Sequence, residues 1–218
     1  MSKAAKINIA IVAGLVLLLA AVIAVIVGVS SANQDDASGD LDPALIENSE
    51  SHALTDPVDP QVTVVEFMDF ECPGCAGLEP TMQELRADLG DEVRFVVRYF
   101  PLDMHPQAIP AAVAAEAAYQ QGEFTAMYEQ LFATQGEWAA DDSAPAYFRD
   151  LADDLGLDLD AYDAAVADPA TEERVMADRA DAVALGLQST PSIIVDGELV
   201  QLQQLTDVRD AIEAALAE

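Results

Sequence analysis

Basic residues are scarce in this chain. Nine lysines and arginines stand against 40 aspartates and glutamates, which gives a formal net charge of −31 over 218 residues. Nucleic-acid binding depends on basic side chains that neutralise phosphates, so this composition argues against a nucleic-acid partner. A surplus of acid keeps a protein hydrated and soluble, but it identifies no substrate.

Sulfur and imidazole are also scarce. The chain has two cysteines, Cys72 and Cys75, and two histidines, His52 and His105. A zinc site needs about four ligands, so a regular one would have to recruit carboxylates or a second chain. A purely structural disulfide across so short a loop would constrain the unfolded chain little. Dithiol–disulfide exchange explains the spacing best, because it needs an attacking thiolate and a nearby thiol that resolves the mixed disulfide. We expect no metal and no cofactor.

Charged residues are absent from one long stretch, residues 9–29, which are all apolar or glycine. At about 1.5 Å per residue, a helix of this length crosses the ~30 Å hydrocarbon layer. Lys3 and Lys6 precede the stretch and acids follow it. The positive-inside rule therefore predicts a cytoplasmic tail at residues 1–8, a single-pass anchor in the cell membrane, and a C-terminal domain outside the cytoplasm.

A cleaved signal peptide is the alternative for this stretch, because small residues at 30–32 offer a cleavage site. The apolar core of a signal peptide usually has about 7–15 residues, which is shorter than this run and favours a retained anchor. Either way the rest of the chain is exported to a compartment where disulfide chemistry takes place.

Apolar periodicity is missing from residues 30–60, which are rich in serine, aspartate and asparagine and contain three prolines. Such a composition buries too little surface to fold alone, so we predict an extracytoplasmic linker. Leu41, Leu45 and Ile46 have the spacing of one helical turn that packs on the following domain. His52 has no partner nearby in the sequence, and we expect its side chain to be solvated.

Strand and helix patterns alternate from residue 61 onwards. Apolar and β-branched runs predict strands at 61–67, 93–100 and 192–195, and Asp196-Gly197 predicts a hairpin turn into a short strand at 199–202. One helix separates the first two strands, and a last helix follows Thr206. Between the second and third strands, helical spacing appears at 107–121, 122–135, 145–155, 159–167 and 171–186. The expected core of this block comprises Phe124, Met127, Tyr128, Leu131 and Phe132.

Three short motifs punctuate this order of elements. Cys72-Pro73-Gly74-Cys75 follows the first strand, Tyr99-Phe100-Pro101-Leu102 ends the second, and Ser189-Thr190-Pro191-Ser192 precedes the third. With these motifs, residues 61–218 resemble the DsbA-like branch of the thioredoxin superfamily. The resemblance implies an α/β thioredoxin fold with a helical insertion at about 106–187, here preceded by one N-terminal transmembrane helix. It also implies a protein thiol-disulfide oxidoreductase.

The expected site has five principal residues. Cys72 should lie exposed at a helix N-terminus, where the helix dipole favours a thiolate, and Cys75 should lie one turn in and resolve the mixed disulfide. Glu66 ends an apolar strand, so desolvation should raise its pKa. The resemblance assigns Glu66 as the proton acceptor for Cys75, and Thr190 and Pro191 as a cis-proline loop that faces the cysteines and binds substrate backbone.

Gly74 departs from the pattern of strongly oxidising relatives, in which a histidine at this place often stabilises the thiolate. We expect His105 to be a polar residue at a helix start rather than a substitute for it. The predicted function is a membrane-anchored oxidase of reduced exported proteins, with a quinone-linked membrane protein as its redox partner. The alternatives are a reductase or isomerase that uses the same dithiol, or a non-catalytic binding or chaperone module.

Overall fold

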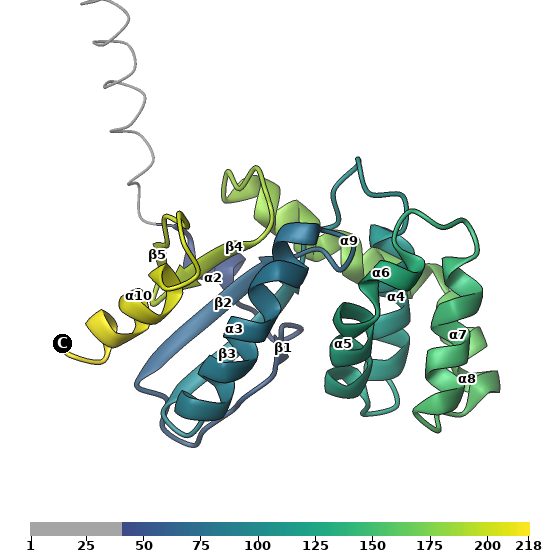
Figure 1. The fold of residues 1–218 in the computed structure, drawn as a ribbon, viewed down its shortest axis with the longest axis horizontal. Coiled ribbons are helices and arrows are strands. Elements are labelled where there is room, and N and C mark those ends of the chain that lie inside the picture. Colours follow the sequence, from purple (N-terminus) through teal and green to yellow (C-terminus); the bar gives the residue numbers. More distant parts are fainter. Residues whose placement is uncertain (1–40) are drawn as a thin grey trace, which may run out of the picture. The chain divides into compact units, whose positions relative to one another are not determined.

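A five-stranded mixed sheet organises residues 41–218, the part of the chain that the computed structural model describes (Figure 1). The strand order is β1-β3-β2-β4-β5. Strands β2 and β3 are parallel, and the other neighbouring pairs are antiparallel. The strands are β1 His52–Ala53, β2 Val62–Met68, β3 Val93–Tyr99, β4 Ser192–Val195 and β5 Glu198–Leu199.

The predicted tail, membrane anchor and first part of the linker lie outside the described residues. Within residues 41–218, none of the helices combines the length and the apolar character needed to cross a membrane.

Both faces of the central strands are covered, which explains why β2 and β3 are almost continuously apolar. Alternate residues, such as Val64 and Phe95, pack against α3 (Pro73–Leu89) and α10 (Asp207–Ala215). The intervening residues, such as Val65 and Val96, pack against α2 (Pro43–Ile46) and α9 (Pro169–Ala184). Figure 1 shows α3 packed along the sheet and α10 beside β5, with most of the helices between β3 and β4 gathered on the side of β1.

The helical insertion between β3 and β4 is present as predicted. Its helices are α4 Ala108–Tyr119, α5 Phe124–Ala133, α6 Gln135–Trp138, α7 Ala144–Asp154, α8 Leu159–Ala167 and α9. Helix α4 is rich in alanine and contacts α5, α7, α8 and α9, so small side chains allow four helices to approach it. The five core residues predicted from the spacing are all buried. The pattern at 122–135 predicted one helix, whereas the chain breaks at Thr134 into α5 and α6.

The prediction of a solvated His52 is wrong. His52 is 2 % exposed and lies on β1, which pairs with β3. Its Nε2 atom is 2.8 Å from Oε2 of Glu116, and its ring stacks on Phe124 with 4.2 Å between centroids. Residues 41–60, which were predicted to be a linker, therefore belong to the same compact unit as the residues that follow. The partners of His52 come from helices that lie far away in the sequence, so no local pattern reveals them.

A buried network of charged side chains links the helical insertion to the sheet. The side chain of Arg98 on β3 is fully buried, and its Nε atom donates to Oδ1 of Asp178 on α9 at 2.7 Å. Arg98 also pairs with Asp181 at 2.6 Å, while Arg174 pairs with Asp178 at 2.7 Å. Nη1 of Arg98 donates to the carbonyl oxygen of Ile46 at 3.1 Å. Buried charges persist in a fold when they are paired in this way.

The β4–β5 hairpin turns at Asp196 and Gly197, whose φ angles are 46° and 90°. Positive φ at both positions is the geometry that an Asp-Gly pair favours in a two-residue hairpin. The last strand ends at Leu199, earlier than the predicted 199–202. The residues that follow leave the sheet and line a groove beside the cysteines.

Candidate active site

The two cysteines lie at the start of α3. Cys72 is the N-cap residue and Pro73 occupies the first helical position, where its missing N–H costs no hydrogen bond. The amide N–H of Cys72 donates to the carbonyl oxygen of Asp69 at 3.1 Å. Both cysteines are free thiols, with exposed fractions of 7 % for Cys72 and 1 % for Cys75. Cys72 is thus the more accessible sulfur, although it is covered more than the sequence predicted.

The two thiols have opposite acidities. The pKa of Cys72 is lowered to about 5, mainly by a hydrogen bond from Cys75 and further by Thr190 and by the backbone of Cys75 and Gly74, against the opposing effect of burial. The pKa of Cys75 is raised well above its ordinary value by burial, by its hydrogen bond to Cys72 and by the charge of Glu66. At neutral pH this arrangement holds one thiolate and one protonated thiol, the state that disulfide exchange requires.

Glu66 lies on β2 and is 2 % exposed. Burial is the main cause that raises its pKa to about 8; the charges of Glu79 and Cys72 add to the rise, and Arg86 opposes it. Its Oε2 atom has no hydrogen-bond partner among the described residues. The predicted burial and raised pKa are confirmed. Its role as the proton acceptor of Cys75 stays a prediction.

Sequence reasoning missed the charged residues behind Glu66. Glu79 and Arg86 on α3 form an ion pair, and Tyr128 donates its phenolic hydrogen to Oε2 of Glu79 at 2.6 Å. Glu79 follows Cys75 by one helical turn and Arg86 follows by three, so all three share one face of α3. This helical spacing is the feature of the sequence from which the cluster could have been predicted. Within this cluster the charge of Glu79 raises the pKa of Glu66 and the charge of Arg86 lowers it.

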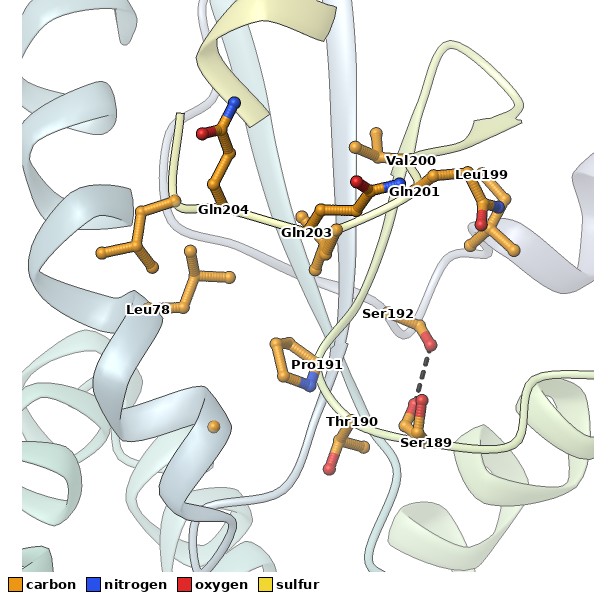
Figure 2. A pocket seen from close by; sticks show the side chains of 13 residues that line it. Leu78, Ser189, Thr190, Pro191, Ser192, Leu199, Val200, Gln201, Gln203 and Gln204 are labelled. Carbon is orange, nitrogen blue, oxygen red and sulfur yellow. Dashed lines mark hydrogen bonds between the residues drawn. The ribbon is translucent and has the colours of Figure 1, made fainter. Parts of the chain in front are cut away.

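The Thr190–Pro191 peptide bond is cis, as expected, and the loop faces Cys72. Sγ of Cys72 lies 3.4 Å from the carbonyl oxygen of Thr190. Figure 2 shows Pro191 between the start of α3 and the segment that carries Gln201, Gln203 and Gln204.

A groove of about 570 Å³ opens beside this loop. Its lining contains no charged side chain, which is unusual in so acidic a chain. The lining residues are Gly74, Leu78, Ser189, Thr190, Pro191, Ser192, Leu199, Val200, Gln201, Leu202, Gln203, Gln204 and Leu205. A Cβ atom at Gly74 would lie 3.3 Å from Cδ of Pro191 and 3.5 Å from Sγ of Cys72. Gly74 therefore keeps the groove open to the thiol.

Polar side chains tie the cysteine loop to the helical insertion, and sequence reasoning missed them too. Nε2 of Gln135 donates to the carbonyl oxygens of Phe70 at 2.6 Å and Cys72 at 3.0 Å. The buried carboxylate of Glu71 accepts hydrogen bonds from the backbone N–H groups of Gln107 and, at 2.7 Å, of Ala140. These contacts join segments more than 30 positions apart, so they have no local signature. Residues 41–218 hold no cluster of three or more histidines, cysteines or carboxylates arranged for a metal.

Comparison with known proteins gives matches over the same domain. Residues 57–214 match the family model described as thioredoxin. The chain is 40 % identical over 141 residues to the Na⁺/H⁺ antiporter NhaA of Herminiimonas arsenicoxydans, and 42 % identical over 142 residues to antiporter NhaA 1 of Salinispora arenicola. Each alignment covers 65 % of this chain but only 22 % and 21 % of the antiporters. The chain therefore spans about a fifth of the length of these relatives.

Solved structures share the architecture. A thioredoxin-like oxidoreductase from Silicibacter pomeroyi has a TM-score of 0.69 and 28 % identity, over 81 % of this chain and 99 % of that one. BdbD from Bacillus subtilis has the same TM-score at 22 % identity, over 78 % and 94 %, and shows the shared fold alone. Wolbachia pipientis alpha-DsbA1, at 20 % identity and a TM-score of 0.65, likewise shares the fold alone. With the family match extending over most of the described residues, this chain belongs to the thioredoxin family.

Proposed function

We propose that this protein oxidises cysteines of reduced exported proteins, with Cys72 as the exchanging sulfur and Cys75 as the resolving one. The observation that carries this direction is the lowered pKa of Cys72, to about 5. A stabilised thiolate stabilises the reduced enzyme, and a stable reduced form makes the disulfide a stronger oxidant. The neighbouring Gly74 supplies no side chain for this purpose, and hydrogen bonds from Cys75, Thr190 and the backbone contribute to the lowered pKa.

The proposed reaction transfers two electrons from substrate to enzyme. A substrate thiolate attacks Sγ of Cys72 in the enzyme disulfide, the Cys72–Cys75 bond breaks, and Cys75 leaves as a thiolate. The high pKa of Cys75 draws a proton onto it, and Glu66 in its protonated form donates that proton. A second substrate thiolate then attacks the substrate sulfur of the mixed disulfide. Cys72 departs as a thiolate, and its low pKa makes it a good leaving group.

Regeneration runs the same chemistry in reverse. The Cys72 thiolate attacks a disulfide of the redox partner, and Cys75 resolves the mixed disulfide after its proton passes to Glu66. A quinone-linked membrane protein is the partner that we propose. Electrons then leave the dithiol for the partner's disulfide, and the enzyme disulfide is restored.

Substrate binding uses the cis-proline loop in this proposal. The loop of Thr190 and Pro191 lies beside Cys72 and forms a wall of the uncharged groove. An extended peptide forms backbone hydrogen bonds along such a loop, with little demand on its side chains. Proteins of varied sequence are therefore suitable substrates.

The proposed location is the outer face of the cell membrane, with residues 9–29 as a single-pass anchor. Two observations support it: the uncharged run with lysines before it and acids after it, and the likeness to antiporters, which by their name move ions across membranes. An anchored domain stays close to a membrane-embedded redox partner.

The reduction potential of the Cys72/Cys75 pair tests the direction. The reduced fraction of the protein is measured in glutathione buffers of graded composition, with Cys72→Ser as the control that cannot form the disulfide. An oxidase should have a potential of about −180 mV or higher. A value near the ~−270 mV of thioredoxin would overturn the oxidase and favour the reductase. Oxidative refolding of a reduced substrate protein, compared with unscrambling of a mispaired one, separates an oxidase from an isomerase.

A further inference from the structure

His105 and Asp69 meet beside the catalytic loop. His105 lies between β3 and α4, and Asp69 lies between β2 and α3. Nδ1 of His105 is 2.7 Å from Oδ2 of Asp69, whose side chain is fully buried, while the imidazole is 15 % exposed. The carboxylate also accepts the backbone N–H of Leu102 at 2.9 Å, which fixes the loop that carries the histidine.

Asp69 connects this histidine to the attacking sulfur. Its carbonyl oxygen accepts the amide N–H of Cys72 at 3.1 Å, and its Oδ1 atom accepts the amide N–H of Glu71 at 2.8 Å. One residue therefore holds the backbone of Cys72 with its main chain and the imidazole of His105 with its side chain. Because Nδ1 donates to the carboxylate, Nε2 is the atom at which the ring gains or loses a proton.

The charges around the imidazole favour its protonated form. Burial alone would lower the pKa of His105, but the hydrogen bond and charge of Asp69 outweigh burial and raise it, with further contributions from Cys72 and Glu71. Asp103, in the same loop, is paired with Arg179. Electrostatic coupling between two groups is reciprocal. Because Asp69 holds both the imidazole of His105 and the backbone of Cys72, a positive charge on the ring favours the thiolate.

We propose that His105 is a positioning residue of the exchange reaction, whose imidazolium, held by Asp69, stabilises the Cys72 thiolate. The imidazolium supplies a positive charge near Cys72, where Gly74 has no side chain that could carry one. It also offsets the negative charges of the buried carboxylates of Asp69 and Glu71, which would otherwise repel the thiolate. The expectation that His105 is only a polar residue at a helix start is thereby replaced. Only the direction of the exchange reaction, oxidation of the substrate, is taken from the proposed function. A stabilised thiolate at Cys72 affects oxidation and reduction alike.

His105→Gln tests the proposal in the full-length protein. The substitution removes the charge and keeps a hydrogen-bond donor toward Asp69. We expect the pKa of Cys72, read from the ultraviolet absorbance of its thiolate against pH, to rise by about one unit, which is about a tenfold smaller ratio of thiolate to thiol at a fixed pH. The glutathione equilibrium should move about tenfold toward the oxidised enzyme. His105→Lys, which keeps a positive charge, should recover most of both shifts.

Asp103→Asn is the matched control, because it removes a charge from the same loop at an exposed ion pair. It should leave the acidity of Cys72 unchanged. An unchanged Cys72 titration in His105→Gln, with or without a loss of stability in urea, would overturn the proposal, because a purely structural histidine alters stability alone. A shifted titration in a protein whose wild-type potential is that of a reductase would retain the role of His105 and reject the oxidase.

Discussion

The sulfur of Cys72 lies 3.4 Å from the carbonyl oxygen of Thr190, a residue that follows it by 118 positions. The contact brings the attacking sulfur against the loop that forms one wall of the uncharged groove. Gly74 and the groove therefore border Cys72 on this side. The reactivity of the Cys72 sulfur depends on the groups that border it on this side.

The two thiols should differ sharply in alkylation. With limiting iodoacetamide, at a pH one to two units above the Cys72 pKa of about 5, the reduced protein should be modified almost entirely at Cys72, because Cys75 stays protonated and buried. Peptide mapping locates the adduct. Cys75→Ser should still be labelled and Cys72→Ser should not; a predominant adduct at Cys75 would contradict the assignment.

Glu66→Gln should make the protein more stable and less active. A carboxyl whose folded pKa is about 8 and whose unfolded value is 4.5 binds its proton more tightly in the folded state. Its contribution to stability is complete below about pH 4.5 and is lost as the pH rises to about 8. Glutamine imitates the protonated form, so the variant should be more stable at pH 8, on the order of a few kcal/mol, with less decline between pH 5 and 8.

Turnover of Glu66→Gln should fall about tenfold or more, because Cys75 loses its proton relay. Urea unfolding against pH and a substrate-oxidation assay check the two effects. Glu198→Gln, at an exposed position on β5, is the control and should change neither. Equal pH dependence in Glu66→Gln and wild type would show that Glu66 does not carry the buried proton.

Gly74→Val should narrow the groove next to the thiol. The first added carbon would lie 3.3 Å from Cδ of Pro191, and the valine methyl groups would extend beyond it. Oxidation of a protein substrate should slow several-fold, while exchange with a small dithiol should slow less. Gly77→Val is a matched control on the same helix, since a Cβ atom there meets nothing within 4 Å. Equal losses with both substrates would argue against steric selection at Gly74.

Asp178→Asn should be strongly destabilising. It weakens the pairing of two arginines, one of them fully buried, and disturbs the bond from the backbone N–H of Tyr99. Breaking a buried pair costs about 3–5 kcal/mol. The exposed pair of Arg149 and Asp163 offers the comparison, and Asp163→Asn should have a much smaller effect on stability. Urea unfolding measures both; similar losses would mean that the buried network contributes no more than a surface pair.

The sequence predicted the features that depend on local pattern. The strands β2, β3 and β4, the insertion helices, the place of the cysteines on α3 and the burial of Glu66 all follow from periodicity or from an acid within an apolar run. Residues 41–60 were predicted to be a linker because they lack apolar periodicity. The single helical turn predicted from Leu41, Leu45 and Ile46 is confirmed at Pro43–Ile46. The two-residue strand at His52 was missed, because its partners are distant residues of β3.

The remaining misses are polar contacts between segments far apart in the chain. His52 meets Glu116 after 64 positions, Arg98 meets Asp178 after 80, and His105 reaches back 36 positions to Asp69. When the partner of a charged or aromatic side chain lies in a distant segment, the neighbouring sequence does not indicate that the side chain is buried. Only the fold brings these groups together, so spacing and composition do not reveal them.

The position of the insertion has a consequence for the order in which the molecule folds. The β2–β4 pairing joins Val64 to Val195, and closing a loop of that length delays a contact relative to helices that pack on their sequence neighbours. Both cysteines precede the insertion, whereas Thr190 and the groove-lining glutamines follow it. The two sulfurs are therefore in place on α3 before the loop of Thr190, which lies against Cys72, has joined the sheet. The surroundings that lower the pKa of Cys72 are complete only when this last segment docks.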